Sequence, residues 1–251
     1  MNQKPDIAAL SGGNDSTAMV LRLAEVEPNP DRIYLYTPTG DEMPDMVAHL
    51  EALECRLGKP LLRPPGPTLR ETIDINRCLP SWRIRFCTRL VKLVPCEAWM
   101  NMNATGGTLS VGLRADEDER QGLYGVGFHV RFPMREWGWG INDVRGYLRS
   151  VGVKVPTRTD CARCFFQRLP EWHRLWKEHP DIYADAVEDE RRISEIRGKP
   201  CTYRSPSRDT WPAGLADLAD EFRRGRLPRG ALTQHELWEG ANDGPCRICR
   251  M

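Results

Sequence analysis

A stretch rich in glycine and serine near the N-terminus has the residue types of an anion-binding loop. It lies between the apolar run 7–10 and an apolar-periodic segment that begins at Thr17, and it reads Ser11-Gly12-Gly13-Asn14-Asp15-Ser16. This order predicts a buried strand, a tight loop and a helix. Glycine permits positive φ and close approach of the backbone to a ligand, while amides at a helix N-terminus suit phosphate. Hydroxyl donors from Ser11 and Ser16 would add to such a site.

Asp15 has two possible functions in this loop. Its carboxylate could cap the helix, or it could help to hold a magnesium ion on bound phosphates. An ordinary Gly-rich turn capped by Asp15 would explain the stretch as well. No Gly-Lys-Ser/Thr ends the loop, which excludes a Walker P-loop.

Two Cys-x-x-Cys pairs form the second group of chemically capable residues. They are Cys161 with Cys164 and Cys246 with Cys249. Two pairs can supply four thiolates to zinc or to an iron–sulfur cluster, although the linker of roughly eighty residues must fold back. By spacing alone, structural zinc is favoured. Three further cysteines sit at apolar or helical positions and are expected to be small core residues, namely Cys55, Cys78 and Cys96.

Strands and helices alternate along the first part of the chain. Apart from those flanking the loop, we predict strands at 33–37, 59–63 and 108–113, and helices at 46–57, after a Thr68 cap, around Thr88, and at 142–149 with an Asn142 cap. This alternation predicts a parallel sheet with right-handed crossovers. Ligands of such sheets lie beyond the carboxyl ends of the strands, where the first loop and the segment 37–42 are expected. Arg114 follows another strand beside Gly112, where a guanidinium could bind phosphate bidentately.

The rest of the chain has a helical pattern. Helices are expected at 169–176, 180–196 and 215–222, with Trp172, Trp176 and Tyr183 as a core stripe. We therefore predict a nucleotide-binding domain at 1–156 and a helical, cysteine-bearing region at 157–251.

Several ordered pieces over residues 6–156 together resemble the phosphoadenosine phosphosulfate (PAPS) reductase family of the N-type ATP pyrophosphatases, the PP-loop or adenine nucleotide alpha hydrolase-like superfamily. The matching pieces are the loop 11–16, Thr39-Gly40-Asp41-Glu42, Cys87-Thr88 with Lys92 and Pro95, Gly112-Leu113-Arg114-Ala115-Asp116-Glu117 with Arg120, Pro133 with Trp137, Asp143-Val144 and Val155-Pro156. The resemblance implies an α/β fold with a doubly wound, mostly parallel sheet that binds an adenine nucleotide.

The resemblance also implies roles for individual residues. ATP with Mg²⁺ would be bound by Ser11, Gly12, Gly13, Asp15, Ser16, Thr37, Thr39, Gly40, Gly112 and Arg114. Asp15, Arg114 and Arg120 would be catalytic. Some family members hold a [4Fe–4S] cluster with cysteines at the positions of Cys87, Cys161 and Cys164. The family's adjacent cysteine pair is here Cys87-Thr88, so the fourth ligand would come from Cys201, Cys246 or Cys249, with Zn²⁺ as the alternative to the cluster.

Sulfonucleotide reduction requires a nucleophilic cysteine in a C-terminal Glu-Cys-Gly-x-His segment in this family, and the chain has none. Our leading hypothesis is an ATP pyrophosphatase that adenylates an acceptor or transfers sulfur to it, in nucleic-acid thiolation or phosphorothioation. Contacts to such a polymer would come from Arg204, Arg208, Arg223, Arg224 and Arg226. The alternatives are an APS or PAPS reductase using Cys246 or Cys249, and a non-catalytic, zinc-stabilised nucleotide-binding subunit.

The composition is typical of a cytoplasmic protein, but it does not identify a binding partner. The 36 basic and 35 acidic residues leave a net charge of +1, so bulk charge does not indicate nucleic-acid binding. No segment has the roughly 18 apolar residues of a membrane span, and no apolar leader precedes the first strand. We expect a cytoplasmic protein whose nine cysteines serve metal or redox chemistry rather than disulfides. A sulfur-donor protein and a second copy in a dimer are possible partners.

Overall fold

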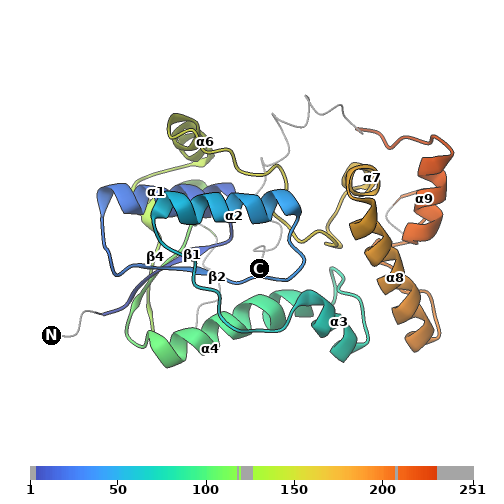
Figure 1. The fold of residues 1–251 in the computed structure, drawn as a ribbon, viewed down its shortest axis with the longest axis horizontal. Coiled ribbons are helices and arrows are strands. Elements are labelled where there is room, and N and C mark those ends of the chain that lie inside the picture. Colours follow the sequence, from blue (N-terminus) through green and yellow to red (C-terminus); the bar gives the residue numbers. More distant parts are fainter. Residues whose placement is uncertain (1–3, 118, 120–126, 207–208, 231–251) are drawn as a thin grey trace.

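A four-stranded parallel sheet forms the centre of the computed structural model, which describes residues 4–117, 119, 127–206 and 209–230 (Figure 1). The strand order is β2-β1-β3-β4, and every neighbouring pair is parallel. The strands are β1 (Asp6–Leu10), β2 (Ile33–Tyr36), β3 (Thr108–Ser110) and β4 (His129–Arg131). The predicted α/β class with a parallel sheet is confirmed.

Helices cover both faces of this sheet, as the doubly wound arrangement requires. The helical elements are α1 (Asn14–Val26), α2 (Pro44–Leu57), α3 (Leu69–Asn76), the π-helical η1 (Thr88–Leu93), α4 (Val94–Asn103), the 3₁₀ turn η2 (Ala115–Glu117), α5 (Pro133–Glu136), α6 (Ile141–Ser150), α7 (Leu169–Glu178), α8 (Pro180–Arg197) and α9 (Leu215–Arg223). Figure 1 shows α1, α2 and α6 on one side of the sheet and α4 on the other, with α7, α8 and α9 gathered at one end.

The sheet departs from the prediction at its two edges. The expected strand at 59–63 is reduced to one parallel bridge between Leu62 and Leu35, and the flanking Pro60 and Pro64 cannot donate to a longer ladder. At the other edge, β4 was not predicted, because His129 and Arg131 leave only one apolar residue in it. Central strands are easier to predict: Ile7 and Ala8 of β1 are both fully buried, as in strands covered on two faces.

Two helix starts test the predicted caps. Thr68 caps α3 as predicted: its Oγ1 accepts from the Glu71 amide at 3.2 Å, and the Glu71 carboxylate accepts from the Thr68 amide at 2.7 Å. The cap of α6 is Gly140 rather than Asn142. Asp143 accepts from the Gly140 amide at 2.9 Å, so Asn142 lies inside the first turn.

One continuous cluster of buried residues includes side chains from both sides of residue 156, so the predicted domain boundary remains a prediction. Trp172 and Tyr183 are 0% and 3% exposed, and Trp176 packs against the same cluster, which confirms the expected core stripe. The expectation for Cys55 is wrong, because this residue is exposed. Helix α2 buries the stripe Met46, Leu50 and Leu53, and Cys55 lies on its other side; Cys78 and Cys96 are half-buried.

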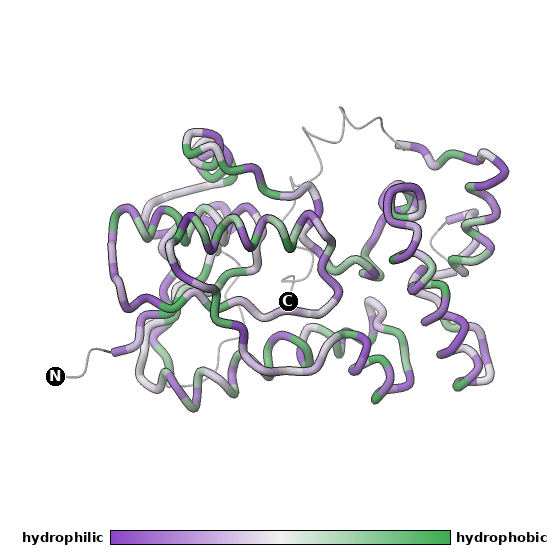
Figure 2. The backbone as a smooth tube through the Cα atoms, viewed as in Figure 1, coloured by the Kyte–Doolittle hydropathy of each residue, from purple (hydrophilic) through white to green (hydrophobic). Residues whose placement is uncertain are grey.

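Hydrophobic and hydrophilic residues alternate along the helices in Figure 2, as expected for helices that pack on one side only. Within the described ranges, no helix has the length and apolar character needed to cross a membrane.

The turn after β2 allows a direct test of the fold. Gly40 has φ of +69°, and a Cβ there would lie 2.7 Å from Cγ2 of Thr68. Gly58 has nearly the same φ, +65°, but a Cβ there would meet nothing within 4 Å. Gly58→Ala should therefore cost only the left-handed backbone strain, about 1–2 kcal/mol of unfolding free energy.

Gly40→Ala should cost that strain and, in addition, roughly 1–3 kcal/mol for overpacking against Thr68. Urea denaturation of both variants measures the difference. Equal losses in the two variants would contradict the close packing of this turn on α3.

Candidate active site

The predicted anion-binding loop is a tight turn between β1 and α1. The Ser11 amide donates to Oγ of Ser16 at 3.1 Å, and the two hydroxyls lie 3.0 Å apart. Gly12 has φ of +77°, and a Cβ there would lie 2.0 Å from the Cε atom of Met46 on α2. The loop is therefore closed by its own serines and covered by α2, and a side chain at residue 12 would displace Met46.

Asp15 does not cap α1. The N-cap residue is Gly13, without a side-chain cap, and the first amides of a helix have no acceptor within the helix. One carboxylate oxygen of Asp15, Oδ2, accepts from Nη1 of Arg114 at 2.7 Å. The other, Oδ1, is buried and has no hydrogen-bond partner among the described residues. Burial raises the pKa of Asp15 to about 6, against the opposing effect of the Arg114 charge.

Close packing of β3 on α1 brings Arg114 to this loop. A Cβ at Gly112, two residues beyond β3, would lie 3.1 Å from Cα of Ser16, so glycine allows this close approach without a shift of α1. Arg114 is 5% exposed and donates from Nε to Asp116 at 2.8 Å as well as to Asp15. The structure thus brings Gly112 and Arg114 to the loop as expected, while a contact from Arg114 to phosphate stays a prediction. Arg120 lies outside the described residues.

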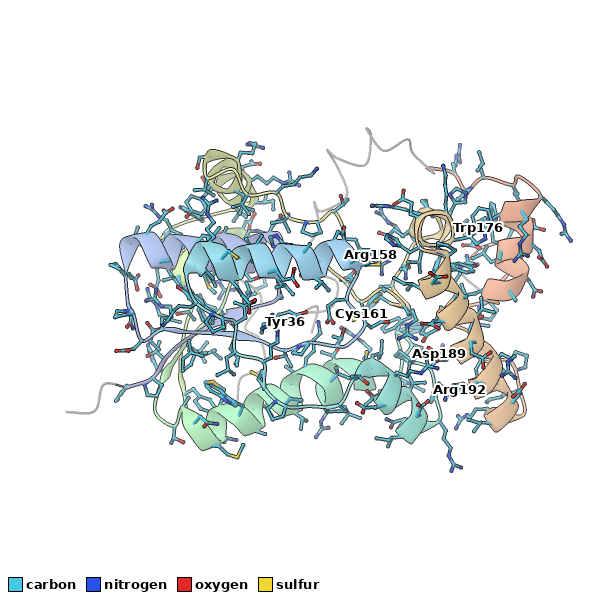
Figure 3. All side chains as sticks on the ribbon, in the orientation of Figure 1. Tyr36, Arg158, Cys161, Trp176, Asp189 and Arg192 are labelled. Carbon is cyan, nitrogen blue, oxygen red and sulfur yellow. The ribbon has the colours of Figure 1, made fainter. Side chains whose placement is uncertain are left out.

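The turn after β2 leads from the loop to the cysteines. Both the amide and Oγ1 of Thr39 donate to Glu42 at 2.6 Å, which fixes the turn just beyond Thr37. The Cys161 thiol donates to Oγ1 of Thr39 at 3.6 Å. Figure 3 shows Cys161 between the end of β2, marked by Tyr36, and Asp189 on α8.

Cys87, Cys161 and Cys164 line one pocket. The other residues around it are Thr39, Leu69, Arg85, Thr88, Val91, Lys92, Phe165 and Phe166. Burial raises the pKa of the Cys161 thiol to about 11, although the Lys92 charge opposes the shift. Burial also raises the pKa values of Cys87 and Cys164. Without a ligand, these three thiols are therefore protonated at neutral pH.

Among the described residues, only some of the cysteines predicted to bind a metal lie in the same pocket. Three of the sulfurs share the pocket, which is the donor type that zinc and iron–sulfur clusters require. In the part of the chain that the structure describes, however, no group of three or more His, Cys, Asp or Glu side chains is arranged to hold a metal ion. Cys201 is not among the lining residues, and Cys246 and Cys249 lie outside the described ranges. The metal or cluster stays a prediction.

Arg163, between the two cysteines of the first pair, was missed by the sequence analysis. Its Nε donates to Oδ1 of Asp41 at 2.6 Å, and its amide donates to Oδ2 at 2.9 Å. Its Nη1 donates to Asp189 of α8 at 2.7 Å. All three residues are at most 6% exposed. A charged residue inside Cys-x-x-Cys was the only available signal, and it does not identify partners this distant in sequence.

Further contacts complete the Asp41–Arg163–Asp189 network. Asp189 also accepts from the Tyr203 hydroxyl at 3.1 Å and from Arg192 at 3.0 Å. Arg192 in turn pairs with Asp74 at the end of α3. The cysteine loop is thus attached to the turn after β2, to α8 and, through Arg192, to α3.

The arginines proposed for nucleic-acid contacts have other roles or partners. Arg204 is 1% exposed and pairs with Asp209 at 2.8 Å, so the expectation that it contacts a polymer is wrong. The exposed arginines of the α9 region pair with acidic residues of the same helix: Arg223 with Asp220, and Arg224 and Arg226 with Glu221. Arg208 lies outside the described residues.

No protein-family model and no curated protein matches this sequence. Among solved structures, the chain is similar to the crystal structure of phosphoadenylyl-sulfate (PAPS) reductase from Candida auris in a phosphate complex. The two are 12% identical with a TM-score of 0.44, over 60% of this chain and 75% of that chain. A similarity of this size carries no inference about activity.

Removal of the Arg163 guanidinium tests the network that holds the cysteine loop. Arg163→Met leaves two buried carboxylates without their shared partner, and loss of one member of a buried ion pair costs about 3–5 kcal/mol. Arg191→Met is the matched control, because Arg191 pairs with two glutamates on the exposed side of α8 and should lose less than about 1 kcal/mol. Chemical denaturation measures both, and a similar small loss in the two variants would contradict the network.

The raised pKa of Asp15 predicts a pH dependence of stability. Because the folded state holds the proton more tightly than the unfolded chain, this carboxyl is stabilising below its ordinary pKa of 3.8, and the contribution is lost as pH rises to about 6. Asp15→Asn should remove this dependence. Between about pH 4 and 6 the variant should thus gain stability relative to the wild type, as measured by urea denaturation at a series of pH values. Parallel profiles would show that Asp15 is not buried in this way.

Proposed function

We propose that the chain is an ATP pyrophosphatase of the PAPS-reductase-like type, which adenylates an acceptor or prepares it for sulfur transfer. The observation that carries the proposal is the state of Asp15. This half-buried carboxylate lies at the N-terminus of α1, binds Arg114 with one oxygen and leaves the other, buried oxygen without a partner among the described residues. A group held in a destabilising environment beside a glycine-rich loop is typical of functional sites.

A magnesium ion fits the unpartnered oxygen of Asp15. Mg²⁺ prefers carboxylate and phosphate oxygens, and it usually keeps only one or two protein ligands in nucleotide sites. The hydroxyls of Ser11 and Ser16 and the first amides of α1 would face the pyrophosphate, with Thr37, Thr39 and Gly40 toward the rest of the nucleotide. A bound magnesium ion would give the ionised Asp15 carboxylate a role, although this ionised form lowers the stability of the fold above about pH 6.

The reaction would be a substitution at the α-phosphorus of ATP. An acceptor oxygen forms a bond to that phosphorus, the bond to the bridging oxygen of the β-phosphate breaks, and pyrophosphate leaves with the electron pair. Arg114 and the helix amides would stabilise the charge that develops on the phosphates. Asp116 and Asp15 hold the Arg114 guanidinium in place in the absence of nucleotide.

The cysteine pocket lies directly beyond this loop. A Cβ at Gly13 would lie 3.6 Å from Oγ1 of Thr159, two residues before Cys161, and the Cys161 thiol contacts Thr39. We propose that Cys87, Cys161 and Cys164 bind a [4Fe–4S] cluster, or zinc as the alternative, with a fourth ligand from Cys246 or Cys249. A cluster would carry or position sulfur for the activated acceptor, and the protein would hold the cluster next to the bound nucleotide.

Magnesium-dependent ATP binding and pyrophosphate release test the proposal. The wild-type chain, purified without oxygen, should bind Mg-ATP in calorimetry and release pyrophosphate. Asp15→Asn should weaken Mg-ATP binding by about tenfold or more, as is usual for residues that support a metal site. Asp185→Asn on the exposed side of α8 is the matched control and should bind like the wild type.

Urea denaturation of Asp15→Asn at neutral pH checks that the variant is folded, so that a loss of binding is not ascribed to unfolding. Equal binding by both variants would contradict the proposed site. ATP binding without pyrophosphate release would favour the non-catalytic subunit, and release of sulfite from APS or PAPS would favour the reductase. Iron and zinc analysis of the same protein, with Cys161→Ala as the comparison, tests the cysteine ligands.

A further inference from the structure

A basic segment between α3 and α4 carries exposed cations to which the proposed reaction assigns no role. No acidic residue occurs in 75–96, although the whole chain has almost as many acids as bases. The segment carries five cations, Arg77, Arg83, Arg85, Arg89 and Lys92. Such local separation of charge, in a chain of net charge +1, predicts a polyanionic partner.

Three of these cations differ from several arginines of α8 and α9. Arg77, Arg83 and Arg89 are exposed, and none of them forms an ion pair with an acidic side chain within the described ranges. Arg191 on α8 and Arg223 on α9, by contrast, each pair with carboxylates of their own helix. The segment between α3 and α4 therefore combines three exposed arginines, unpaired among the described residues, with a stretch of sequence that has no acidic residue.

A turn in this segment presents an aromatic ring. The amide of Ser81 donates to the carbonyl of Ile84 at 3.1 Å, and the amide of Ile84 donates back to the carbonyl of Ser81 at 3.1 Å. Trp82 at the tip is 62% exposed, and the guanidinium carbon of Arg83 lies 4.9 Å from its ring centroid. An exposed indole stacked with an arginine is the kind of platform on which unpaired bases stack.

The turn leads directly into the cysteine pocket. Arg85 and Cys87 line that pocket, and the guanidinium carbon of Arg85 lies 5.2 Å from the ring centroid of Phe166. A strand bound on Trp82 would thus have its neighbouring nucleotides at the pocket entrance. We infer that the turn 81–84 docks single-stranded nucleic acid, by stacking a base on Trp82 and binding phosphates with Arg77, Arg83 and Arg89. Bases of a duplex are already stacked inside it and cannot reach the indole.

This inference rests on the proposed function, because it names the class of the acceptor, but its test measures binding without ATP. Fluorescence anisotropy of the full chain is measured with a labelled single-stranded oligonucleotide of ~20 residues, as DNA and as RNA, and with the matching duplex. Trp82→Ala should weaken single-strand binding by about tenfold, and Trp82→Phe by less than about threefold, because the smaller ring still stacks. The exposure of Trp82 means that both variants should fold.

The arginines are tested through the salt dependence. Arg83→Ala and Arg89→Ala should each weaken binding and reduce the slope of log K against log salt by about 0.7, the value for one lost phosphate contact to a single strand. Arg223→Ala with Arg224→Ala is the matched control and should leave affinity within about twofold, because both side chains are already paired.

The inference is overturned if no single strand binds, or if Trp82→Ala binds the single strand as tightly as the wild type. It is also overturned if duplex and single strand bind equally and the control variant loses as much affinity as Arg83→Ala. Its failure can be told apart from failure of the proposed function. Pyrophosphate release without strand binding would overturn only the docking surface. Strand binding that depends on Trp82, in a protein that does not bind Mg-ATP, would support the docking surface and overturn the proposed reaction.

Discussion

The buried ion-pair network of Asp41, Arg163 and Asp189 is the interaction on which the arrangement of the site depends. Burial of a charge is tolerated only when its hydrogen-bonding capacity is used, and here each carboxylate accepts at least two hydrogen bonds. Because Arg163 lies between Cys161 and Cys164, satisfying its guanidinium also fixes the position of both thiols. The ion pairs of Arg163 with Asp41 and Asp189 therefore hold the cysteine pocket beside the end of β2.

The parallel sheet explains why the loop and the pocket are neighbours. β1 and β2 pair in parallel, so the chain leaves both strands at the same edge of the sheet. The loop after β1 and the turn after β2 therefore meet there, and β3 delivers Arg114 to the same edge. The cysteine loop after α6 reaches this edge through the contact of Cys161 with Thr39 in the turn after β2.

The loop combines a closely packed backbone with a carboxylate in an unfavourable environment. The Asp15 carboxylate loses solvation and, among the described residues, pairs with Arg114 alone, so the folded state disfavours its charged form. By contrast, the serines of the loop satisfy one another and Gly12 is fitted closely under Met46. The backbone of the loop is thus well packed, while its one carboxylate is left in an unfavourable state. In the proposed function, a magnesium ion bound with the nucleotide would remove that cost.

Elements that depend on nearby residues were predictable from the sequence alone. The strand-loop-helix order around 11–16, the Thr68 cap and the helical periodicity after residue 169 each involve residues only a few positions apart. The tertiary structure alone decided which charges meet. Asp15 pairs with Arg114 at a separation of 99 residues, and Asp41 with Arg163 at 122, so neither pair has a local signal. The same reason explains why Arg204 is buried and Cys55 exposed: which side of a segment faces the core is set by packing partners from distant parts of the chain.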